Sequence, residues 1–283
     1  MKTLGYYNGK YGEIDEMSIP MNDRACWFGD GVYDATCCGN YVIFNLEEHI
    51  DRFYNSAGLL GIRIPMEKAE LAALLSDLVR KLDSPDQFVY WQATRGTAPR
   101  NHAFPKEGNA NIWVFCRPAK IGDMENERLK LITVEDTRFL HCNIKTLNLI
   151  PNVLAAQKTE EAGADEAVFY RAGGRVTECA HSNVHIIKNG MLKTAPTDHM
   201  ILPGVARAHL IKMAKKLCIP VDEHPFTLDE LMDADEVIVT ASSNFCMQAA
   251  EVDGKPVGGK APELLHALQH ELLEEYLEYT HQK

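Results

Sequence analysis

The sequence predicts a mixed α and β protein with two domains, a smaller one over residues 1–120 and a larger one over 121–283. Strand-like runs alternate with amphipathic helical stretches along the whole chain, which is typical of α/β and α+β proteins. Asn-Gly pairs at 8–9 and 189–190 indicate tight hairpins in both halves. A polar link, "KIGDMENER", separates the halves and places the boundary near residues 118–127.

The first half opens as strand, turn and strand in "LGYYNGKYGEI". "YVIFNLEEHIDRFYNSAGLLGI" starts as a short strand, and from near Glu47 its apolar residues recur at helical spacing. A second helix lies in "MEKAELAALLSDLVRKL", where leucines form one stripe and Ser84-Pro85 ends it. Two strands follow, in "QFVYWQATRG" and "NIWVFCRPA".

The second half alternates more regularly. It begins with a strand in "LKLITVEDT", and "LIPNVLAAQKTEEAG" predicts a helix with Pro151 in its first turn and Gly163 past its end. Further helices are expected in "GVARAHLIKMAKKLCI" and "PELLHALQHELLEEYLEY". The remaining strands are expected in "EAVFY", "RVTE", "NVHIIKNGMLKTA" and "EVIVTA".

Composition narrows the class of protein. The formal net charge of −11 argues against nucleic acid or an anionic membrane as the main partner. No segment approaches the length of a transmembrane helix, and the N-terminus "MKTLGYYNGK" has no secretory signal. The eight cysteines include no CxxC pair and the eleven histidines show no ligand spacing. We therefore expect a cytoplasmic protein with reduced thiols and no metal site.

Lys145 lies in an unusually apolar run, "HCNIKTLNLIPNVLAAQ". One interpretation is that the aliphatic stem packs on the core while the ammonium reaches water. The other is a reactive lysine, because partial desolvation favours the neutral amine. The run alone does not decide between them.

Two segments of the first half could contribute to a site. In "NDRACWFGDGVYDA", glycines either form a tight turn before a strand or let the backbone approach a ligand, to which Tyr33 could present its hydroxyl. In "TRGTAPRNHAF", Arg100 and His102 alternate on a segment that we expect to be extended, so both would point to one side. That pair suits a carboxylate, and the simpler alternative is a solvated loop.

Three segments of the second half also stand out. Glu178, in "RVTECAHSNVH", is either a surface carboxylate or the partner of a ligand cation. "MILPGVARAHLI" opens a helix after Pro203-Gly204, and a helix N-terminus suits a phosphate. "VTASSNF" puts hydroxyls at the end of a strand. The nucleophile elbow, Walker loop, zincin and dinucleotide fingerprints are absent from the sequence.

In this order, "FGDGVYD", "EHIDRFYNSA", "TRGTAPRNH", "CNIKTLNL", "VTE…SNV" and "ILPGVAR" resemble the class IV aminotransferases over nearly the whole chain. These are pyridoxal phosphate (PLP) enzymes of fold type IV, and "RGTAPRNH" is most similar to the D-amino acid (D-alanine type) aminotransferases. The resemblance implies a small N-terminal α/β domain and a larger barrel-like C-terminal domain that carries the PLP lysine. It also implies transfer of an amino group from a D-amino acid to a 2-oxo acid such as 2-oxoglutarate. The same resemblance implies a homodimer whose active sites lie near the subunit interface.

The resemblance assigns a role to each matching residue. Lys145 would form the Schiff base with PLP and move the reacting proton, and Glu178 would face the pyridine nitrogen and keep it protonated. The residues expected at the cofactor's phosphate and ring are Arg52, Leu202, Gly204, Val205, Ala206 and Ser242. The residues expected to bind the substrate α-carboxylate are Tyr33, Arg100 and His102. Arg138 is a candidate neighbour of Glu178 or of the cofactor's phenolate.

Three positions depart from the family pattern and leave the substrate range open. Ala206 stands where a threonine is common, Cys179-Ala180-His181 replaces a run of serines, and Asp34 replaces a longer glutamate. An aminodeoxychorismate lyase-type enzyme or a branched-chain aminotransferase on the same fold is the alternative. A non-catalytic cofactor-binding or scaffold protein is a third hypothesis, which retention of Lys145 and its companions disfavours.

Overall fold

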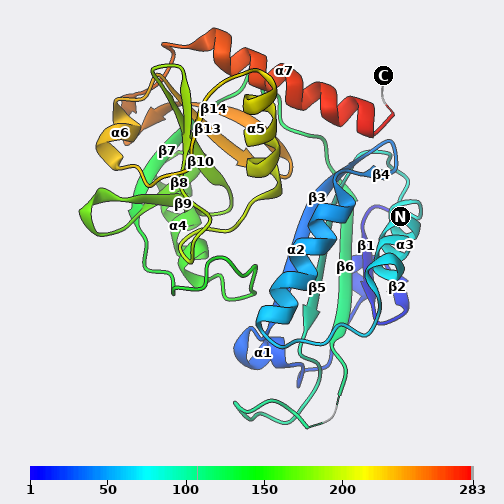
Figure 1. The fold of residues 1–283 in the computed structure, drawn as a ribbon. Helices are drawn as coiled ribbons and strands as arrows, with labels where there is room; N and C mark the ends of the chain where they lie inside the picture. The colour runs from blue at the N-terminus through cyan, green and yellow to red at the C-terminus, as the bar shows by residue number, and fades with distance from the viewer. Residues whose placement is uncertain (107, 282–283) are drawn as a thin grey trace. The chain divides into compact units, whose positions relative to one another are not determined.

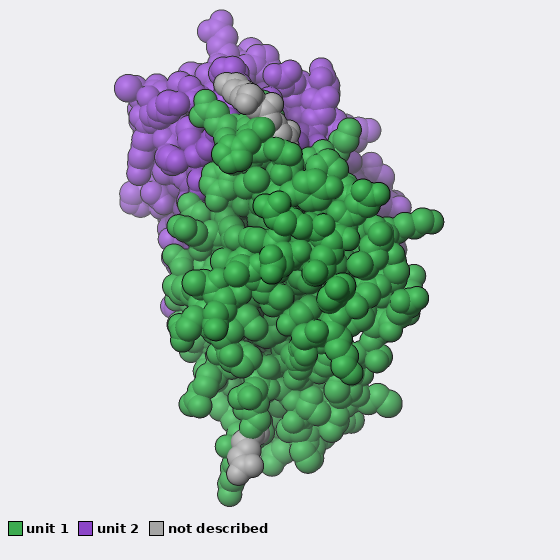
Figure 2. All heavy atoms as spheres, turned by 90° about the vertical axis from the view of Figure 1, so that its right-hand side faces the viewer, with its two compact units in different colours: residues 1–120, 144–148, 277–283 green, residues 121–143, 149–276 purple. Residues whose placement is uncertain are grey.

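A computed structural model describes residues 1–106 and 108–281 of the chain. The chain divides into two compact units, which Figure 2 colours separately. Unit 1 comprises residues 1–120, 144–148 and those from 277 onward, and unit 2 comprises 121–143 and 149–276. Lys145 is thus grouped with unit 1. Division into folding domains at 1–120 and 121–283 stays a prediction.

Unit 1 is built on a six-stranded antiparallel sheet of order β2-β1-β6-β5-β3-β4. Figure 1 shows α2 lying along the strands of this sheet. The elements of unit 1 are β1 (Leu4–Tyr7), β2 (Lys10–Gly12), η1 (Ile14–Glu16), α1 (Arg24–Phe28), β3 (Gly31–Gly39), β4 (Val42–Ile43), α2 (Leu46–Leu59), α3 (Lys68–Val79), β5 (Gln87–Thr94) and β6 (Asn111–Pro118).

One face of this sheet and the apolar faces of α2 and α3 form a single core. Phe53 of α2 and Trp91 of β5 are fully buried there, with ring centroids 6.2 Å apart. Because side chains alternate along a strand, β3 directs Asp34 to the helix-covered face and Tyr33 to the other face. Tyr33 accordingly stacks on Tyr90, with ring centroids 5.4 Å apart. Adjacent residues of β3 thus serve different sides of the sheet.

Unit 2 is built on a nine-stranded sheet in which β12-β11-β10-β13-β14-β7-β8-β9 are neighbours in that order and β15 pairs with β14. Its elements begin with β7 (Arg128–Glu135), α4 (Ile150–Glu161), β8 (Glu166–Tyr170), η2 (Ala172–Gly174), β9 (Val176–Cys179), β10 (Asn183–Lys188) and β11 (Met191–Thr194). They continue with α5 (Val205–Lys216), β12 (Val221–Asp222), α6 (Leu228–Met232), β13 (Glu236–Ala241), β14 (Asn244–Val252), β15 (Lys255–Pro256) and α7 (Pro262–Tyr279).

The connection from β9 to β10 requires this sheet to curl. The two strands are five neighbours apart in the pairing order, which in a flat sheet is about 24 Å. Only residues 180–182 join them, and four Cα–Cα links reach about 15 Å at most. The sheet therefore bends towards closure, in agreement with the predicted barrel-like C-terminal fold.

Most of the predicted elements are confirmed. Asn8 and Gly9 have φ of 45° and 93°, and Asn189 and Gly190 have 51° and 74°, as hairpin turns of this type require. Strand β14 was not predicted, because "NFCMQAAEV" contains residues of low strand propensity. Its burial between β13 and β7 compensates for that composition.

Across residues 1–106 and 108–281, no helix has both the length and the apolar character needed to cross a bilayer. In the same part of the chain, no three His, Cys, Asp or Glu side chains come together as a metal site needs.

Candidate active site

Lys145 lies in a short segment that runs along the edge of β3. The Tyr33 N–H donates to the Lys145 carbonyl at 3.0 Å, and the Leu147 N–H donates to the Gly31 carbonyl at 3.0 Å. Pairing with β3 is limited to an isolated bridge at Thr146, so Lys145 does not lie on a regular strand. The bonds on both sides of Lys145 still fix the backbone that carries it.

Residue 31 must be a glycine because β5 and the Lys145 segment both pass very close to its backbone. A Cβ at Gly31 would lie 2.6 Å from the Ala93 carbonyl oxygen and 2.6 Å from Leu147 Cδ1. Such distances are far inside van der Waals contact, so the glycine lets the chain's own backbone pack tightly. In the Gly-Asp-Gly sequence, Gly29 adopts the positive φ of the turn and Gly31 allows close packing at the edge of β3.

The Lys145 side chain is half-buried and lies against an aromatic ring. Its Nζ is 4.3 Å from the centroid of the Tyr33 ring. On the backbone, the Lys145 N–H donates to Ser56 Oγ of α2 at 3.2 Å. Tyr33, predicted as a substrate residue, and Lys145, predicted as the catalytic residue, are therefore neighbours.

Arg52 belongs to a buried ionic cluster with Asp34. Its Nε and Nη2 donate to Asp34 Oδ2 and Oδ1 at 2.8 and 2.7 Å. His49 Nδ1 lies 2.8 Å from Asp34 Oδ1. Burial would raise the pKa of Asp34, but the Arg52 charge and the contact with His49 outweigh it and hold that pKa well below its usual range. Burial lowers the pKa of His49. Asp34 thus fixes the guanidinium of Arg52.

Arg100 and His102 meet at one aromatic ring, that of Phe28. The Arg100 Cζ lies 5.3 Å from the Phe28 centroid, and the His102 ring lies 4.9 Å from it. Both side chains belong to exposed residues. Arg100 and His102 are therefore close to the same ring, as the prediction of a pair requires. The sequence did not indicate that Phe28 would be their shared neighbour.

The loop that carries this pair is bent, so the expectation of an extended segment was wrong. The Arg24 Nη1 donates to the carbonyls of Asn101 and Ala103 at 2.6 and 3.3 Å, and its Nη2 donates to that of His102 at 3.3 Å. Gathering successive carbonyls around one guanidinium is incompatible with an extended strand. Arg24 is in turn held by Asp30, whose Oδ2 lies 2.7 Å from its Nε.

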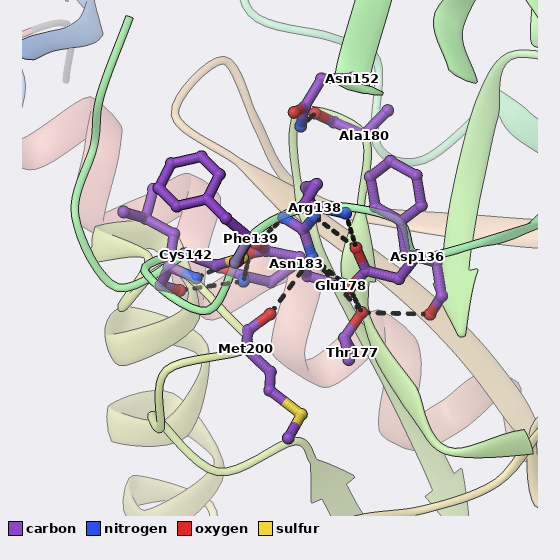
Figure 3. Close-up of polar contacts among 12 residues, drawn as sticks. Asp136, Arg138, Phe139, Cys142, Asn152, Thr177, Glu178, Ala180, Asn183 and Met200 are labelled. Atoms are coloured by element: carbon purple, nitrogen blue, oxygen red, sulfur yellow. Dashed lines mark hydrogen bonds and ion pairs between the residues drawn. The ribbon is translucent and has the colours of Figure 1, made fainter. Parts of the chain in front are cut away.

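In unit 2, Glu178 is a buried carboxylate surrounded by donors (Figure 3). Its Oε1 accepts a charge-assisted hydrogen bond from Arg138 Nη1. Its Oε2 accepts from Asn183 Nδ2 at 3.0 Å and from the Leu202 N–H at 2.9 Å. These donors favour an ionised Glu178 that can face a cation. The predicted proximity of Arg138 and Glu178 is confirmed.

Leu202 and Gly204 lead directly into α5. Gly204 is the N-cap residue of this helix and supplies no side-chain cap, so the first N–H groups, at Val205 and Ala206, face outward from the helix start. A phosphate is the chemical group that such a terminus suits best. Ser242 lies in the turn between β13 and β14, so its hydroxyl is at the end of a strand, as expected. The uncapped N–H groups and the Glu178 carboxylate, which accepts from the Leu202 N–H, fit a phosphorylated ligand with a cationic nitrogen.

Replacement of Gly204 by alanine is expected to destabilise unit 2. A Cβ there would lie 2.0 Å from Asn183 Oδ1, so Asn183 would have to move away from Glu178. We expect the free energy of unfolding, measured in urea, to fall by about 1–3 kcal/mol. Gly58→Ala is the matched control, since a Cβ there meets nothing within 4 Å and alanine favours the helix. Equal stability of the two variants would contradict the close contact at Gly204.

The run Cys179-Ala180-His181 forms the end of β9 and the turn to β10. The His181 Nδ1 makes a short contact with Glu166 Oε2, while its side chain is 72% exposed. The Ala180 carbonyl accepts from Asn152 Nδ2 at 2.6 Å. The Ala180 carbonyl and the His181 imidazole thus both have partners in unit 2.

Sequence reasoning missed Phe28, Asp136 and Asn183. Phe28 immediately precedes the Gly-Asp-Gly turn, and Asn183 stands in the quoted "SNV", but neither composition nor spacing indicates what they contact. Asp136 stands two residues before Arg138, a spacing at which an acid and a base on an extended chain lie on one side. The Asp136–Arg138 pair could therefore have been predicted.

Comparison with known proteins places the chain in a family. Residues 31–252 match the family model described as amino-transferase class IV. The chain is 36% identical to the D-alanine aminotransferase of Bacillus licheniformis, over 97% of this chain and 98% of that protein. It is 38% identical to the D-alanine aminotransferase of Listeria monocytogenes serotype 4b, over 98% of this chain and 97% of that protein.

Solved structures share the fold. The branched-chain aminotransferase of the thermophilic archaeon Thermoproteus uzoniensis, solved with norvaline, is 22% identical with a TM-score of 0.85, covering 98% of this chain and 96% of that one. The Escherichia coli branched-chain amino acid aminotransferase is 21% identical with a TM-score of 0.87, covering 96% and 94%. At such identity these two structures bear on the fold alone. The family match and the full-length relatives establish that the chain belongs to the class IV aminotransferases, the PLP-dependent transaminases of fold type IV.

Proposed function

We propose that this transaminase moves the amino group of a D-amino acid of the D-alanine type to a 2-oxo acid such as 2-oxoglutarate. Full-length identity of 36–38% to D-alanine aminotransferases supports this substrate class. The observation that carries the proposal is the convergence of Arg100 and His102 on the Phe28 ring, because a guanidinium and an imidazole at one place can both donate hydrogen bonds to an α-carboxylate. The alternative, a branched-chain aminotransferase, has the support of fold likeness only.

We propose the cofactor-binding roles that the family resemblance implies, and the contacts within each unit support them. When bound, PLP supplies an aldehyde that bonds to amines and a ring that withdraws electrons from the substrate Cα. We assign the ring nitrogen to Glu178 and the ring face to Leu202. We assign the phosphate to Arg52, Gly204, Val205, Ala206 and Ser242. Ala206 has no hydroxyl, so it contributes its N–H alone.

We assign to Lys145 the transfer of the proton from the substrate Cα. With PLP bound, its amine would be the point of covalent attachment, and the free amine would take the proton from the substrate Cα. The backbone bonds at Tyr33 and Ser56 hold the residue while its side chain moves. Tyr33, which contacts Lys145 Nζ, is assigned with Arg100 and His102 to the substrate carboxylate.

Replacing Arg100 by alanine is expected to weaken substrate binding much more than cofactor binding. Loss of a hydrogen bond to a charged group costs about 1.5–3 kcal/mol, roughly a 10- to 150-fold rise in KM for D-alanine. The dissociation constant of PLP should stay within about twofold, because Arg100 is not assigned to it. Arg63→Ala, an exposed arginine in the same unit, is the control and should change neither value. Equal losses for substrate and cofactor would make Arg100 a structural residue.

We also propose a homodimer in the cytoplasm. The side chains of Ile150, Val153 and Leu154 on α4 are 69%, 58% and 60% exposed, an apolar cluster that a second copy of the chain would cover. All eight cysteines are free thiols, which supports a reducing compartment. Sedimentation velocity of the purified protein tests the pairing.

A panel of D- and L-amino acids with 2-oxoglutarate tests the function as a whole. We expect 2-oxo acid formation from D-alanine and little from L-leucine. Aminodeoxychorismate is included to test the lyase-type alternative. Turnover of L-leucine without turnover of D-alanine would overturn the proposal. A protein that stays colourless after soaking in PLP would favour the non-catalytic hypothesis.

A further inference from the structure

Asp136 is a buried carboxylate just after β7 that has no role in the site described so far. Its side chain is fully buried, and its Oδ1 accepts from the Arg138 N–H at 3.1 Å and from Arg138 Nε at 2.9 Å (Figure 3). Its Oδ2 accepts from Arg138 Nη2 at 2.9 Å, Arg171 Nε at 3.0 Å and Thr177 Oγ1 at 3.0 Å. Burial would raise the pKa of Asp136, but the bonds and charges of these partners outweigh it and lower that pKa. Asp136 is therefore a fixed negative charge.

Arg138 is clamped by Asp136 on one side and by Glu178 on the other. Its Nε and Nη2 bind Asp136, its Nη1 binds Glu178, and its Nη2 also donates to the Met200 carbonyl at 3.2 Å. Its guanidinium covers the Phe169 ring, with Cζ 4.5 Å from the centroid. A planar guanidinium bonded along two edges and on one face has a single orientation. Asp136 thus determines where Arg138 presents its Nη1.

The balance of charge shows what Asp136 changes at Glu178. Asp136, Arg138, Glu178 and Arg171 carry two negative and two positive charges. Without Asp136, the two arginines would outnumber the single carboxylate of Glu178. A cation next to Glu178 would then meet a net positive surrounding, which a buried setting screens poorly.

We propose that Asp136 is a positioning residue that acts through Arg138 to keep the Glu178 carboxylate oriented and available to a cationic ring nitrogen. The inference rests on the proposed function, because it takes the PLP ring nitrogen as the partner of Glu178. Asp136 itself touches neither substrate nor cofactor in this assignment. It sets the strength of an interaction made by Glu178.

The test compares two ligands of the apoprotein, PLP and 1-deaza-PLP, in which carbon replaces the ring nitrogen. The ratio of their dissociation constants, deaza analogue over PLP, reports the Glu178 interaction with the nitrogen. A general structural loss weakens both ligands equally and leaves the ratio unchanged. The variants are Asp136→Asn, Glu178→Gln and the control Asp253→Asn. Asp253 also binds β7, through the Thr133 N–H and hydroxyl, and it has no contact with Arg138.

We expect a large ratio in the wild type and in Asp253→Asn, and a ratio near one in Glu178→Gln. In Asp136→Asn the ratio should fall about tenfold, the usual scale for outer partners of a ligating group. A ratio for Asp136→Asn equal to that of Asp253→Asn would overturn the inference. If Asp136→Asn does not fold, Arg138→Lys replaces it, because a lysine lacks the planar fork that binds Asp136 and Glu178 together, and an unchanged ratio there would overturn the inference equally.

The same measurements separate this inference from the proposed function. A wild-type apoprotein that binds neither ligand would refute the proposed cofactor site. A wild-type ratio of one would refute the Glu178 assignment and the role of Asp136 with it. A large wild-type ratio that only Glu178→Gln abolishes would leave the function intact and reject Asp136 alone.

Discussion

Replacing Lys145 by alanine is expected to abolish covalent attachment of PLP and nearly all transamination. In the proposed function the amine would both bond to the cofactor and take the proton from the substrate Cα, and acid–base catalysis alone contributes about 10²–10⁴-fold. Because the segment is held by backbone bonds to Tyr33 and Ser56, the variant should keep its fold. Borohydride reduction followed by mass spectrometry should find the cofactor on the wild-type peptide that contains Lys145 and on none of the variant's peptides.

Two controls make this result specific. Lys158→Ala, an exposed lysine of α4, should leave attachment and turnover unchanged. Added methylamine should restore part of the turnover of Lys145→Ala, since a small free amine can take the same proton. Full activity in Lys145→Ala would show that another group performs the proton transfer.

The fold was predictable where local signals and tertiary packing agree. The two Asn-Gly hairpins and helix α4 follow from residues that permit few alternatives, namely positive-φ turns and Pro151 in a first turn. Strand β14 was not predictable from propensity, because its stability comes from two neighbouring strands that are distant in sequence. For the same reason the backbone pairing of the Lys145 segment could not be predicted, because its partner β3 lies more than a hundred residues earlier.

The residues of the candidate site were easier to predict than the neighbouring residues that hold them in place. Chemistry alone left two interpretations each for Lys145, Glu178 and Arg100, and the resemblance to the class IV aminotransferases favoured the functional one. The residues that contact and orient these side chains were not predicted. Phe28 packs against Arg100 and His102, and Asp136 binds Arg138. Such partners emerge only when the chain is folded, because no spacing rule links Phe28 to Arg100.

The second large effect is expected at Asp34. Replacement by alanine would leave Arg52, whose side chain is 8% exposed, without its bidentate carboxylate. Removing one partner of a buried pair costs about 3–5 kcal/mol, which we expect as the loss in free energy of unfolding in urea at pH 7. Asp51→Ala is the control, because the Asp51–Lys68 pair is 67% and 54% exposed and such pairs contribute at most about 1 kcal/mol. Similar losses in both variants would show that the buried cluster does not support the fold.

The pH dependence of stability gives this prediction a second, independent measurement. The pKa of Asp34 is lowered in the folded protein, so its contribution is fully present above the unfolded value of about 3.9 and is lost as the pH falls towards the folded value. His49 acts in the same direction: its folded pKa is also lowered, so the unfolded chain takes up its proton first once the pH falls below about 6.5. Wild-type stability should therefore decline more steeply than that of Asp34→Ala below about pH 4, where the wild type loses the Asp34 contribution that the variant already lacks. Since the same carboxylate holds Arg52, the acid-sensitive part of the fold is also the part that we assign to the cofactor phosphate.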